Sequence, residues 1–291
     1  MLSNKILHPL IRQALKEDRA HRDVTTRLTI PARARCTAGI IAKETGIVCG
    51  LKAAREAFML GHEKRLKFSA GVKDGTRCAK GDTIARIRGE ARAILVRERV
   101  AINFLSLLSG IATMTRSFVD RTRGTRTRIM DTRKTTPALR ILEKYAVRTG
   151  GGMNHRTALD GAVLIKDNHL RAGKYLVDGR LDEKKFSEMI KRVRRHSDLS
   201  VEVEVENMDE FRGVIRCRPD IIMLDNFTVP NLKKAAALRD RHFPRVKLEA
   251  SGGIRIAQVS RIARTGVDSI SVGALTHSPA AFDFSLEIIP E

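Results

Sequence analysis

Residues 131–156, DTRKTTPALRILEKYAVRTGGGMNHR, hold more groups able to do chemistry than any other stretch of this chain. Four arginines and two lysines surround a Gly-Gly-Gly run, and the apolar run of LIKDNH (164–169) ends just beyond in Lys166. Arginine binds planar carboxylates or phosphates bidentately, whereas lysine acts as a mobile point charge. The stretch therefore predicts a site for a ligand with several negative charges, although a solvated basic face is the commoner meaning of such a run.

The second half of the chain carries short apolar runs that end in polar residues or glycine. They are RIMDT (128–132), AVLIKD (162–167), VEVEVEN (201–207), DIIMLDN (220–226), VKLEASGG (246–253) and SISVGA (269–274). Their spacing of about 20 to 40 residues leaves room for a helix after most strands, and parallel strands buried on both faces have this apolar character. The pattern predicts an α/β fold and favours a closed or nearly closed barrel of parallel strands over an open sheet.

In such barrels the reactive groups collect at the carboxyl ends of the strands. This rule selects Arg133, Lys134, Lys166, Glu204, Asp225, Ser251, Gly252, Gly253 and Gly273. We therefore expect cations, carboxylates and glycine loops to meet at one rim of the barrel.

The carboxylates at this rim are candidates for a metal site. Glu202, Glu204 and Glu206 alternate with valines and so share one face of a strand, which is also typical of an edge strand with a wet acidic face. Asp225 closes an apolar run, where an aspartate can alternatively cap the next turn. Glu204 and Asp225, on adjacent strands, are expected to hold Mg²⁺ together with water and substrate oxygens.

Two glycine loops follow the last two strands. SGG (251–253) and VGA (272–274) each precede an expected helix, where backbone N–H groups bind phosphate and glycine lets the phosphate approach the main chain. Glycine commonly follows a strand, so neither loop alone predicts a phosphate site. Together they resemble the paired phosphate-binding loops of parallel barrels.

The N-terminal part of the chain mixes short elements of both kinds. Helical spacing covers residues 6–16 and 51–60, a strand is expected at 36–41, and glycine-punctuated short strands fill 71–95. A long helix is expected over 94–119, with Gly110 inside it allowing close packing or a break. The change of rhythm near residue 107 separates an N-terminal part of mixed elements over 1–107 from a barrel over 108–274, which a tail over about 275–291 follows.

Composition narrows the class of protein. Among 291 residues there is no apolar stretch near the ~20 residues that span a membrane, and the N-terminus has no secretory h-region. Four scattered cysteines predict reduced thiols in a cytoplasmic protein. The net charge of +22 attracts anions of any kind, yet aromatic residues make up only 4% of the chain, which disfavours recognition of nucleic acid by base stacking.

With these residues assembled, the chain closely resembles the quinolinate phosphoribosyltransferases, the carboxylating nicotinate-nucleotide pyrophosphorylases. The resemblance runs nearly end to end, in order and spacing. Its motifs here are EDRAHRDVTT (17–26), RERVAINFLSLLSGIAT (97–113), DTRKTTPALR (131–140), GGMNHR (151–156), LIKDNH (164–169), VEVEVEN (201–207), DIIMLDNF (220–227), LEASGGI (248–254) and DSISVGALTHS (268–278).

The resemblance implies a fold, a reaction and an assembly. The fold is an N-terminal α/β sandwich, joined in part by the C-terminal tail, packed on an open α/β barrel. The reaction condenses quinolinate with phosphoribosyl pyrophosphate (PRPP), with Mg²⁺, and yields nicotinate mononucleotide, pyrophosphate and carbon dioxide in de novo NAD biosynthesis. The assembly is a homodimer, or a higher homo-oligomer, in which each active site is completed by the partner subunit.

The resemblance also implies residue roles. Arg99 reaches quinolinate across the dimer, and the quinolinate carboxylates are held by Thr132, Arg133, His155 and Arg156. Lys134 and Lys166 bridge quinolinate and PRPP, while Glu204 and Asp225 serve the ribose and Mg²⁺. The 5′-phosphate is held by Ser251, Gly252, Gly253 and Gly273, and Ser271 and Val272 are further substrate-binding residues.

Two alternatives remain at this point. A related phosphoribosyltransferase acting on nicotinate needs fewer cations than the set Arg99, Arg133, His155 and Arg156 provides, so that set favours a dicarboxylate. A nucleic-acid-binding protein on an inactive enzyme fold would account for the charge, but not for intact lysines, carboxylates and glycine loops. We expect no specific nucleic-acid partner and no membrane association.

Overall fold

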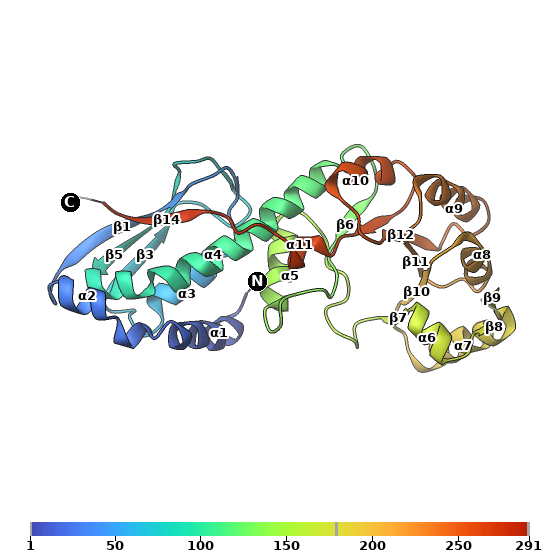
Figure 1. Cartoon of the computed structure of the whole chain (residues 1–291), viewed down its shortest axis with the longest axis horizontal. Helices are drawn as coiled ribbons and strands as arrows, with labels where there is room; N and C mark the ends of the chain where they lie inside the picture. Colours follow the sequence, from blue (N-terminus) through green and yellow to red (C-terminus); the bar gives the residue numbers. More distant parts are fainter. Residues whose placement is uncertain (1, 178–179, 290–291) are drawn as a thin grey trace. The chain divides into compact units, whose positions relative to one another are not determined.

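The computed structural model describes residues 2–177 and 180–289 (Figure 1). Their fold divides into two compact units. Unit 1 falls within Met1–Arg116, Ile141–Gly151 and Ser278–Glu291, and unit 2 within Ser117–Arg140 and Gly152–His277. Residues 108–116 and 141–151, which the sequence pattern assigns to the barrel, thus lie in unit 1, and residues 290–291 of the expected tail lie outside the described residues.

Unit 1 contains an antiparallel sheet flanked by helices. The sheet has the order β14-β1-β5-β3. Its strands are β1 (Arg35–Ala42), β3 (Leu66–Ala70), β5 (Thr83–Glu90) and β14 (Phe284–Ile289), and a second ladder joins β2 (Gly46–Ile47) to β4 (Arg77–Cys78). The helices are α1 (Asn4–Glu17), η1 (Ala20–Arg22), α2 (Val24–Thr29), α3 (Leu51–Met59) and most of α4 (Ala91–Asp120) and α5 (Arg140–Thr149). The last strand of the chain therefore completes the sheet begun by the first.

Helix α4 runs through Gly110 without a break. A Cβ atom added at Gly110 would lie 2.1 Å from the carbonyl oxygen of Ala280, so the glycine lets the C-terminal segment approach the helix closely. The same segment is fixed by a hydrogen bond from the Phe282 N–H to the Ser106 carbonyl, 3.0 Å long. Of the two roles open to this glycine, close packing is the one observed.

Unit 2 is built on six parallel strands in the order β6-β13-β12-β11-β10-β7. They are β6 (Arg128–Met130), β7 (Val163–Ile165), β10 (Val201–Val205), β11 (Ile221–Asp225), β12 (Lys247–Ser251) and β13 (Ser269–Ser271), which coincide with the six predicted apolar runs. The first strand pairs with the last, as in a barrel, and within the described residues no strand pairing joins β6 to β7, so the barrel is open there. The α/β prediction with an open parallel barrel is confirmed.

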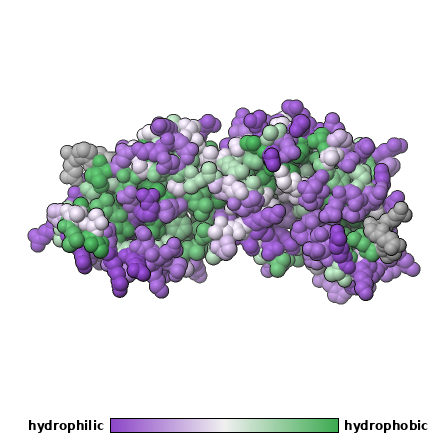
Figure 2. All heavy atoms as spheres, viewed as in Figure 1, coloured by the Kyte–Doolittle hydropathy of each residue, from purple (hydrophilic) through white to green (hydrophobic). Residues whose placement is uncertain are grey.

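Helices alternate with these strands, as the spacing of the runs predicts. They are α6 (Asp167–Ala172), α7 (Glu183–His196), α8 (Met208–Arg216), α9 (Val229–His242), α10 (Ile256–Ala263) and the short α11 (Ala274–His277), and a hairpin of β8 (Leu176–Val177) and β9 (Arg180–Leu181) precedes α7. Each of the helices α7, α8 and α9 contributes buried apolar residues, among them Phe186, Phe211 and Leu232 respectively. Hydrophilic residues predominate on the visible outer face of unit 2 (Figure 2), as expected for amphipathic helices that cover a sheet.

Across the described part of the chain, no helix combines the length and the apolar character that crossing a membrane requires. None of the four cysteines is joined in a disulfide.

Candidate active site

A cavity of about 390 Å³ lies at the carboxyl ends of the strands of unit 2. Its walls bring together ten of the residues selected from the sequence. They are Thr132, Arg133, Lys134, His155, Arg156, Lys166, Glu204, Asp225, Ser251 and Ser271, joined by Leu164 and Met223. Segments more than 130 residues apart in the chain thus meet at one rim, because the strands that carry them are parallel and adjacent.

The loop after β6 presents Lys134 to the cavity. The Lys134 N–H donates to the Thr132 hydroxyl at 3.0 Å, and the Lys134 carbonyl accepts the Thr276 hydroxyl at 2.7 Å. Thr276 is almost fully buried on α11, directly after β13. The backbone of Lys134 is therefore held at its N–H and at its carbonyl, while its side chain remains exposed.

The Asn-His-Arg triplet is placed beside the same loop by Asp131. Residue Met153 pairs in parallel with Met130 at the end of β6. The buried Asp131 carboxylate accepts the His155 N–H at 2.8 Å and the Asn154 side-chain amide at 2.5 Å. The chain leaving the Gly-Gly-Gly run therefore has a defined path into the cavity, fixed by one carboxylate.

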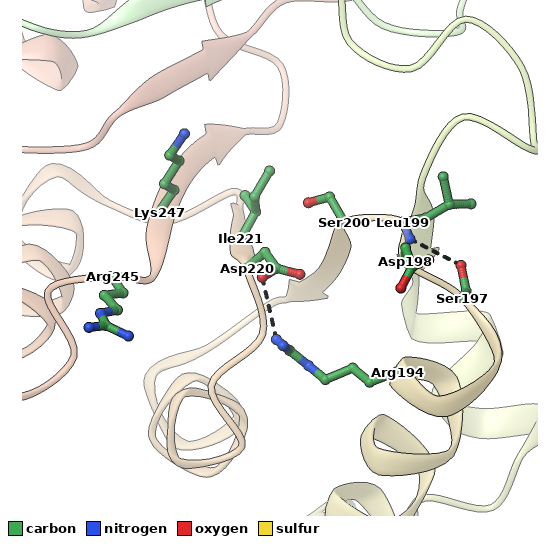
Figure 3. Close-up of a pocket in the computed structure, with 9 residues that line it drawn as sticks. All are labelled: Arg194, Ser197, Asp198, Leu199, Ser200, Asp220, Ile221, Arg245 and Lys247. Atoms are coloured by element: carbon green, nitrogen blue, oxygen red, sulfur yellow. Dashed lines mark hydrogen bonds and ion pairs between the residues drawn. The ribbon is translucent and has the colours of Figure 1, made fainter.

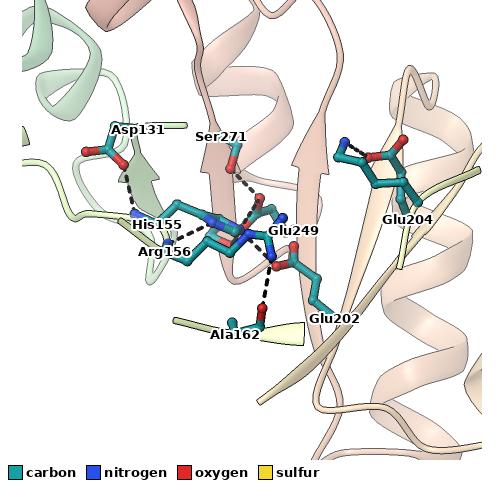
Figure 4. Close-up of polar contacts among 10 residues, drawn as sticks. Asp131, His155, Arg156, Ala162, Glu202, Glu204, Glu249 and Ser271 are labelled. Carbon is teal, nitrogen blue, oxygen red and sulfur yellow. Dashed lines mark hydrogen bonds and ion pairs between the residues drawn. The ribbon is translucent and has the colours of Figure 1, made fainter. Parts of the chain in front are cut away.

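His155 has internal partners for both ring nitrogens. Its Nδ1 accepts the Arg156 N–H at 2.8 Å, and its Nε2 lies 2.8 Å from Glu202 and 3.8 Å from Glu249 (Figure 4). Direct donation to a substrate carboxylate, expected from the sequence, would require the ring to leave these partners. His155 instead links the cavity wall to two buried carboxylates beneath it.

These two carboxylates form the most deeply buried charged cluster of the site. Glu249 accepts hydroxyl hydrogen bonds from Ser271 and, at 3.1 Å, from Ser269. Burial, and next the charge of Glu202, raise the pKa of Glu249 to about 7, while His155 and the two serines act in the opposite direction. Ligand atoms of His155, Glu202 and Glu249 lie within 4.8 Å of one another, a spacing open to a cation, although serine hydroxyls already occupy both oxygens of Glu249.

Two guanidinium groups face the cavity close together. Burial, followed by the charge of Arg133, lowers the pKa of Arg156, and the charge of Glu202 opposes this shift. Arg156 donates from one terminal nitrogen to the Ala162 carbonyl at 2.9 Å. The Nε of Arg133 is buried and has no hydrogen-bond partner among the described residues. Both guanidinium groups belong to residues that line the cavity, where they can bind an anionic ligand.

The opposite wall carries the candidate metal ligands. Lys166 donates to Glu204 at 2.5 Å, and Asp225 accepts the side-chain amide of Asn226 at 2.7 Å. Glu204 and Asp225 come from adjacent parallel strands, so their side chains offer oxygens to the same cavity. A few carboxylate oxygens, with water and substrate completing the shell, suit Mg²⁺.

Of the two glycine loops, Ser251 lines the cavity, whereas the glycines themselves do not. Gly252 has a φ of +95°, and a Cβ atom there would lie 2.3 Å from the Asn226 side-chain oxygen, so the turn requires glycine. At Gly273 a Cβ atom would lie 3.2 Å from both the Lys134 and the His277 side chains. The predicted residues of these loops outside the lining are Gly252, Gly253, Val272 and Gly273, with Val272 buried.

Arg99 is the remaining predicted residue. It is exposed on α4 within unit 1 and is not among the residues that line the cavity. Its assignment to a site therefore rests on the resemblance and not on contacts within the chain.

A second hollow lies at the amino ends of the same strands. It is lined by Arg194, Ser197, Asp198, Leu199, Ser200, Asp220, Ile221, Arg245 and Lys247, and Arg194 pairs with Asp220 (Figure 3). Charged groups here are spread over an open surface, in contrast to the converging groups at the carboxyl ends. In such barrels the residues at the amino ends of the strands usually contribute to stability and not to catalysis.

Sequence reasoning missed three residues of this region, Asp131, Glu202 and Glu249. A signal for Glu249 exists, since this glutamate stands between the apolar residues Leu248 and Ala250 within a predicted strand. Glu202 was placed on the acidic face of its strand, but without a partner. The partners come from other strands, so only the fold reveals them.

Comparisons with known proteins identify relatives over the whole chain. Residues 111–287 match the family model of the quinolinate phosphoribosyl transferase C-terminal domain, and residues 23–109 match that of the N-terminal domain. The nicotinate-nucleotide pyrophosphorylase [carboxylating] of Mycobacterium leprae is 39% identical over 96% of this chain and 95% of its own length. The probable enzyme of the same name from Bacillus subtilis is 38% identical, with 97% and 93% covered.

Solved structures agree with these matches. The nicotinate-nucleotide pyrophosphorylase of Francisella tularensis superposes with a TM-score of 0.88 at 36% identity, covering 99% of this chain and 98% of that one. Human nicotinic acid phosphoribosyltransferase has a TM-score of 0.59 at 13% identity, covering 100% of this chain and 75% of that one, and shares the fold alone.

Proposed function

Because the chain belongs to the quinolinate phosphoribosyltransferase family, we propose that its cavity binds quinolinate and PRPP side by side and transfers the phosphoribosyl group with decarboxylation. The products are nicotinate mononucleotide, pyrophosphate and carbon dioxide, and the reaction belongs to NAD biosynthesis. The observation that carries this proposal is the cavity itself. It combines the paired guanidiniums of Arg133 and Arg156 with two lysines, Lys134 and Lys166, and with the carboxylates of Glu204 and Asp225.

Quinolinate is assigned to the arginine wall. Its two carboxylates suit the donors of Arg133 and Arg156, because a guanidinium matches a planar carboxylate bidentately. Thr132 lines the same wall, and His155 contributes through its position behind Arg156. Arg133 and Arg156 repel each other when the cavity holds no anion, so a dicarboxylate relieves that repulsion as it binds.

PRPP is assigned to the strand ends from β10 to β13. Its 5′-phosphate is placed on the loops of Ser251, Gly252 and Gly253 and of Ser271, Val272 and Gly273, where glycine permits close approach of a phosphate to the main chain. Lys134 and Lys166 then lie between the two ligands. Their charges stabilise the leaving pyrophosphate.

Chemistry follows at C1 of the ribose. As pyrophosphate departs, positive charge develops on the sugar, and the carboxylates of Glu204 and Asp225 stabilise it. The pyridine nitrogen attacks this carbon and becomes positively charged. This positive charge stabilises the electron pair that stays on C2 when the C2 carboxylate leaves as carbon dioxide, and a proton from water then takes the place of the carboxylate on C2. Fixing both reactants in line supplies a large share of the rate, up to ~7–11 kcal/mol in favourable intramolecular cases.

Mg²⁺ is part of the proposal. Glu204 and Asp225 would hold it, since they are the two carboxylates from neighbouring strands that line the cavity. When bound with PRPP, Mg²⁺ would neutralise charge on the pyrophosphate. Lys166, which donates to Glu204 at 2.5 Å, balances the negative charge of that carboxylate when neither the metal nor PRPP is bound.

The assembly is proposed to be a homodimer in which Arg99 of one subunit completes the site of the other. The proposal gives a role to Arg99, which is exposed on α4 and is not among the residues that line the cavity. We assign the reaction to the cytoplasm, in agreement with four cysteines that form no disulfide and with the bacterial relatives. No specific nucleic-acid partner is proposed.

The experiment that tests this function is release of labelled carbon dioxide from carboxyl-labelled quinolinate by the purified protein. PRPP and Mg²⁺ are present, and each component is omitted in turn. We expect release only with all three, with nicotinate mononucleotide formed in equal amount. Turnover of nicotinate with none of quinolinate would assign the chain to another substrate, and no turnover of either would reject the proposal.

A further inference from the structure

We propose that Glu202 is a positioning residue that sets the affinity of the cavity for its dicarboxylate without touching it. The inference rests on the proposed function, in which the arginine wall binds quinolinate. Glu202 is buried as the second residue of β10 and does not line the cavity. It acts through two residues that do, His155 and Arg156.

The first link is a chain of contacts through the His155 ring. The Nε2 atom of His155 lies 2.8 Å from the Glu202 carboxylate. The Nδ1 atom, on the other side of the ring, accepts the Arg156 N–H at 2.8 Å. Together with the bond from the His155 N–H to Asp131, these contacts leave the ring little freedom to rotate. The backbone of Arg156 is thereby tied to a carboxylate in the strand behind it.

The second link is charge. Burial, and next the charge of the neighbouring Arg133, lower the pKa of Arg156, and Glu202 is the carboxylate whose charge opposes this shift. Without that offset, the Arg156 guanidinium is repelled from the position that faces the ligand. Glu202 therefore holds Arg156 electrostatically as well as through the His155 ring.

Glu249 lies beside the contact between His155 and Glu202 and helps to keep the His155 ring in place. Two serine hydroxyls hold its carboxylate, 3.8 Å from the same His155 nitrogen, so the space beneath the ring is filled by a second fixed group. Figure 4 shows Glu202 and Glu249 on the same side of His155, with Ser271 behind Glu249. His155 cannot move inward, and its contact with Glu202 is preserved.

Glu202 is kept at a cost to the fold. Its Oε1 is buried and finds no hydrogen-bond partner among residues 2–177 and 180–289, and a second carboxylate lies nearby. An unpaired buried carboxylate oxygen destabilises a folded protein, so a role in stability does not explain this residue. A role in holding the ligand-binding groups does.

The test compares Glu202→Gln and Glu202→Ala with Glu206→Gln, a matched control just beyond the same strand, where the side chain is exposed. Gln keeps an acceptor for His155 and removes the charge, whereas Ala removes both. We expect the KM for quinolinate to rise about tenfold in the Gln variant, the effect of losing roughly one favourable charge contact, and further in the Ala variant. The KM for PRPP should equal that of the control, and the thermal unfolding midpoint of the Gln variant should be no lower than that of the control.

The outcome that overturns the proposal is a Gln variant whose KM for quinolinate equals that of the control, or one in which both KM values rise together. Calorimetric binding of quinolinate without PRPP separates this from the proposed function. If the parent protein binds quinolinate but does not turn it over, the proposed reaction fails and the role of Glu202 is read from affinity. If the parent does not bind quinolinate, both fail.

Discussion

Lys134 enters the cavity from a loop whose backbone is held at two points, by the Thr132 and Thr276 hydroxyls. The side chain itself is exposed, and its stem lies close to Gly273. Position and charge are therefore separable at this residue, because the loop is fixed by backbone contacts and not by the ammonium group. The same separation applies to Glu202, which acts on the ligand only through its neighbours.

Lys134→Ala should lower kcat by at least about a hundredfold, the usual scale for removing a preorganised charge at a developing anion. Its unfolding free energy should change by no more than about 0.5 kcal/mol, because an exposed side chain is removed. Steady-state kinetics and urea unfolding measure the two effects. Lys184→Ala, an exposed lysine on α7, is the control, and a Lys134 variant as active as this control would reject the assignment.

Glu249 predicts a pH dependence of stability. Its folded-state pKa of about 7 lies above its ordinary 4.5, so the folded chain keeps a proton that the unfolded chain has lost between these values. The stability contributed by this proton is complete below about 4.5 and disappears as the pH rises through about 7.

Glu249→Gln removes this dependence, because glutamine stays neutral. Urea unfolding at pH 5 to 8 should show the free energy of unfolding of the variant gaining on that of the parent protein as the pH rises, by up to a few kcal/mol on the scale of about 1.4 kcal/mol per pKa unit. Glu206→Gln should show no such trend. A constant difference between Glu249→Gln and the parent across this range would show that Glu249 titrates normally.

At the scale of elements, the parallel strands bring the site together and α4 supports unit 1. Each strand delivers one or two polar residues at its carboxyl end, and the loops that follow are fixed by short contacts such as those of Asp131 and Thr276. Helix α4 carries a glycine at the point where the C-terminal segment crosses it. A residue that is poor for an isolated helix is thus required by packing.

Gly110→Ala tests this packing requirement. In a free helix the change would stabilise by about 1 kcal/mol, but here the new methyl group would overlap the Ala280 carbonyl, so we expect destabilisation of about 1–3 kcal/mol. Asn103→Ala, on an exposed turn of the same helix, should raise stability slightly. Thermal unfolding of both variants checks the opposite signs, and a stabilised Gly110→Ala protein would contradict the close approach.

At the scale of the whole molecule, the proposed assembly and the net charge of +22 make separate predictions. The first concerns Arg99, which is exposed on α4 and absent from the lining of the cavity. The second concerns both substrates, since quinolinate and PRPP are anions. Neither depends on details of the cavity.

Mixing two inactive variants tests the assembly. Arg99→Ala and Lys134→Ala, unfolded and refolded together, should regain about a quarter of the activity, because half of randomly formed dimers pair the two variants and one of their two sites is then intact. Each variant refolded alone is the control. No recovery, with mixed dimers detected by mass, would show that Arg99 does not act across subunits.

Salt tests the charge. Between about 50 and 500 mM NaCl the kcat/KM for both substrates should fall several-fold, because screening weakens the attraction of anions to a basic surface, while kcat changes less. Stability measured over the same range excludes unfolding as the cause. A kcat/KM independent of salt would mean that the excess charge does not steer the substrates.

The sequence by itself determined the parallel strands and most of the rim. Buried parallel strands must be apolar, so each appears as a short run, and the residue that ends the run is the one that faces the site. For this reason Lys166, Glu204, Asp225 and Ser251 were found without a structure, and the long motifs named the family.

Only the tertiary structure decided the contacts beneath the rim and the division into units. Glu202, Glu249 and His155 come from β10, from β12 and from the segment beside β6, and nothing in their spacing says that they meet. His155 was accordingly assigned to the substrate, whereas its ring nitrogens contact the protein. Residues 141–151 likewise join unit 1 because α5 packs there. Local patterns report which face of an element is buried, but the partner across the core is set by how distant strands are ordered.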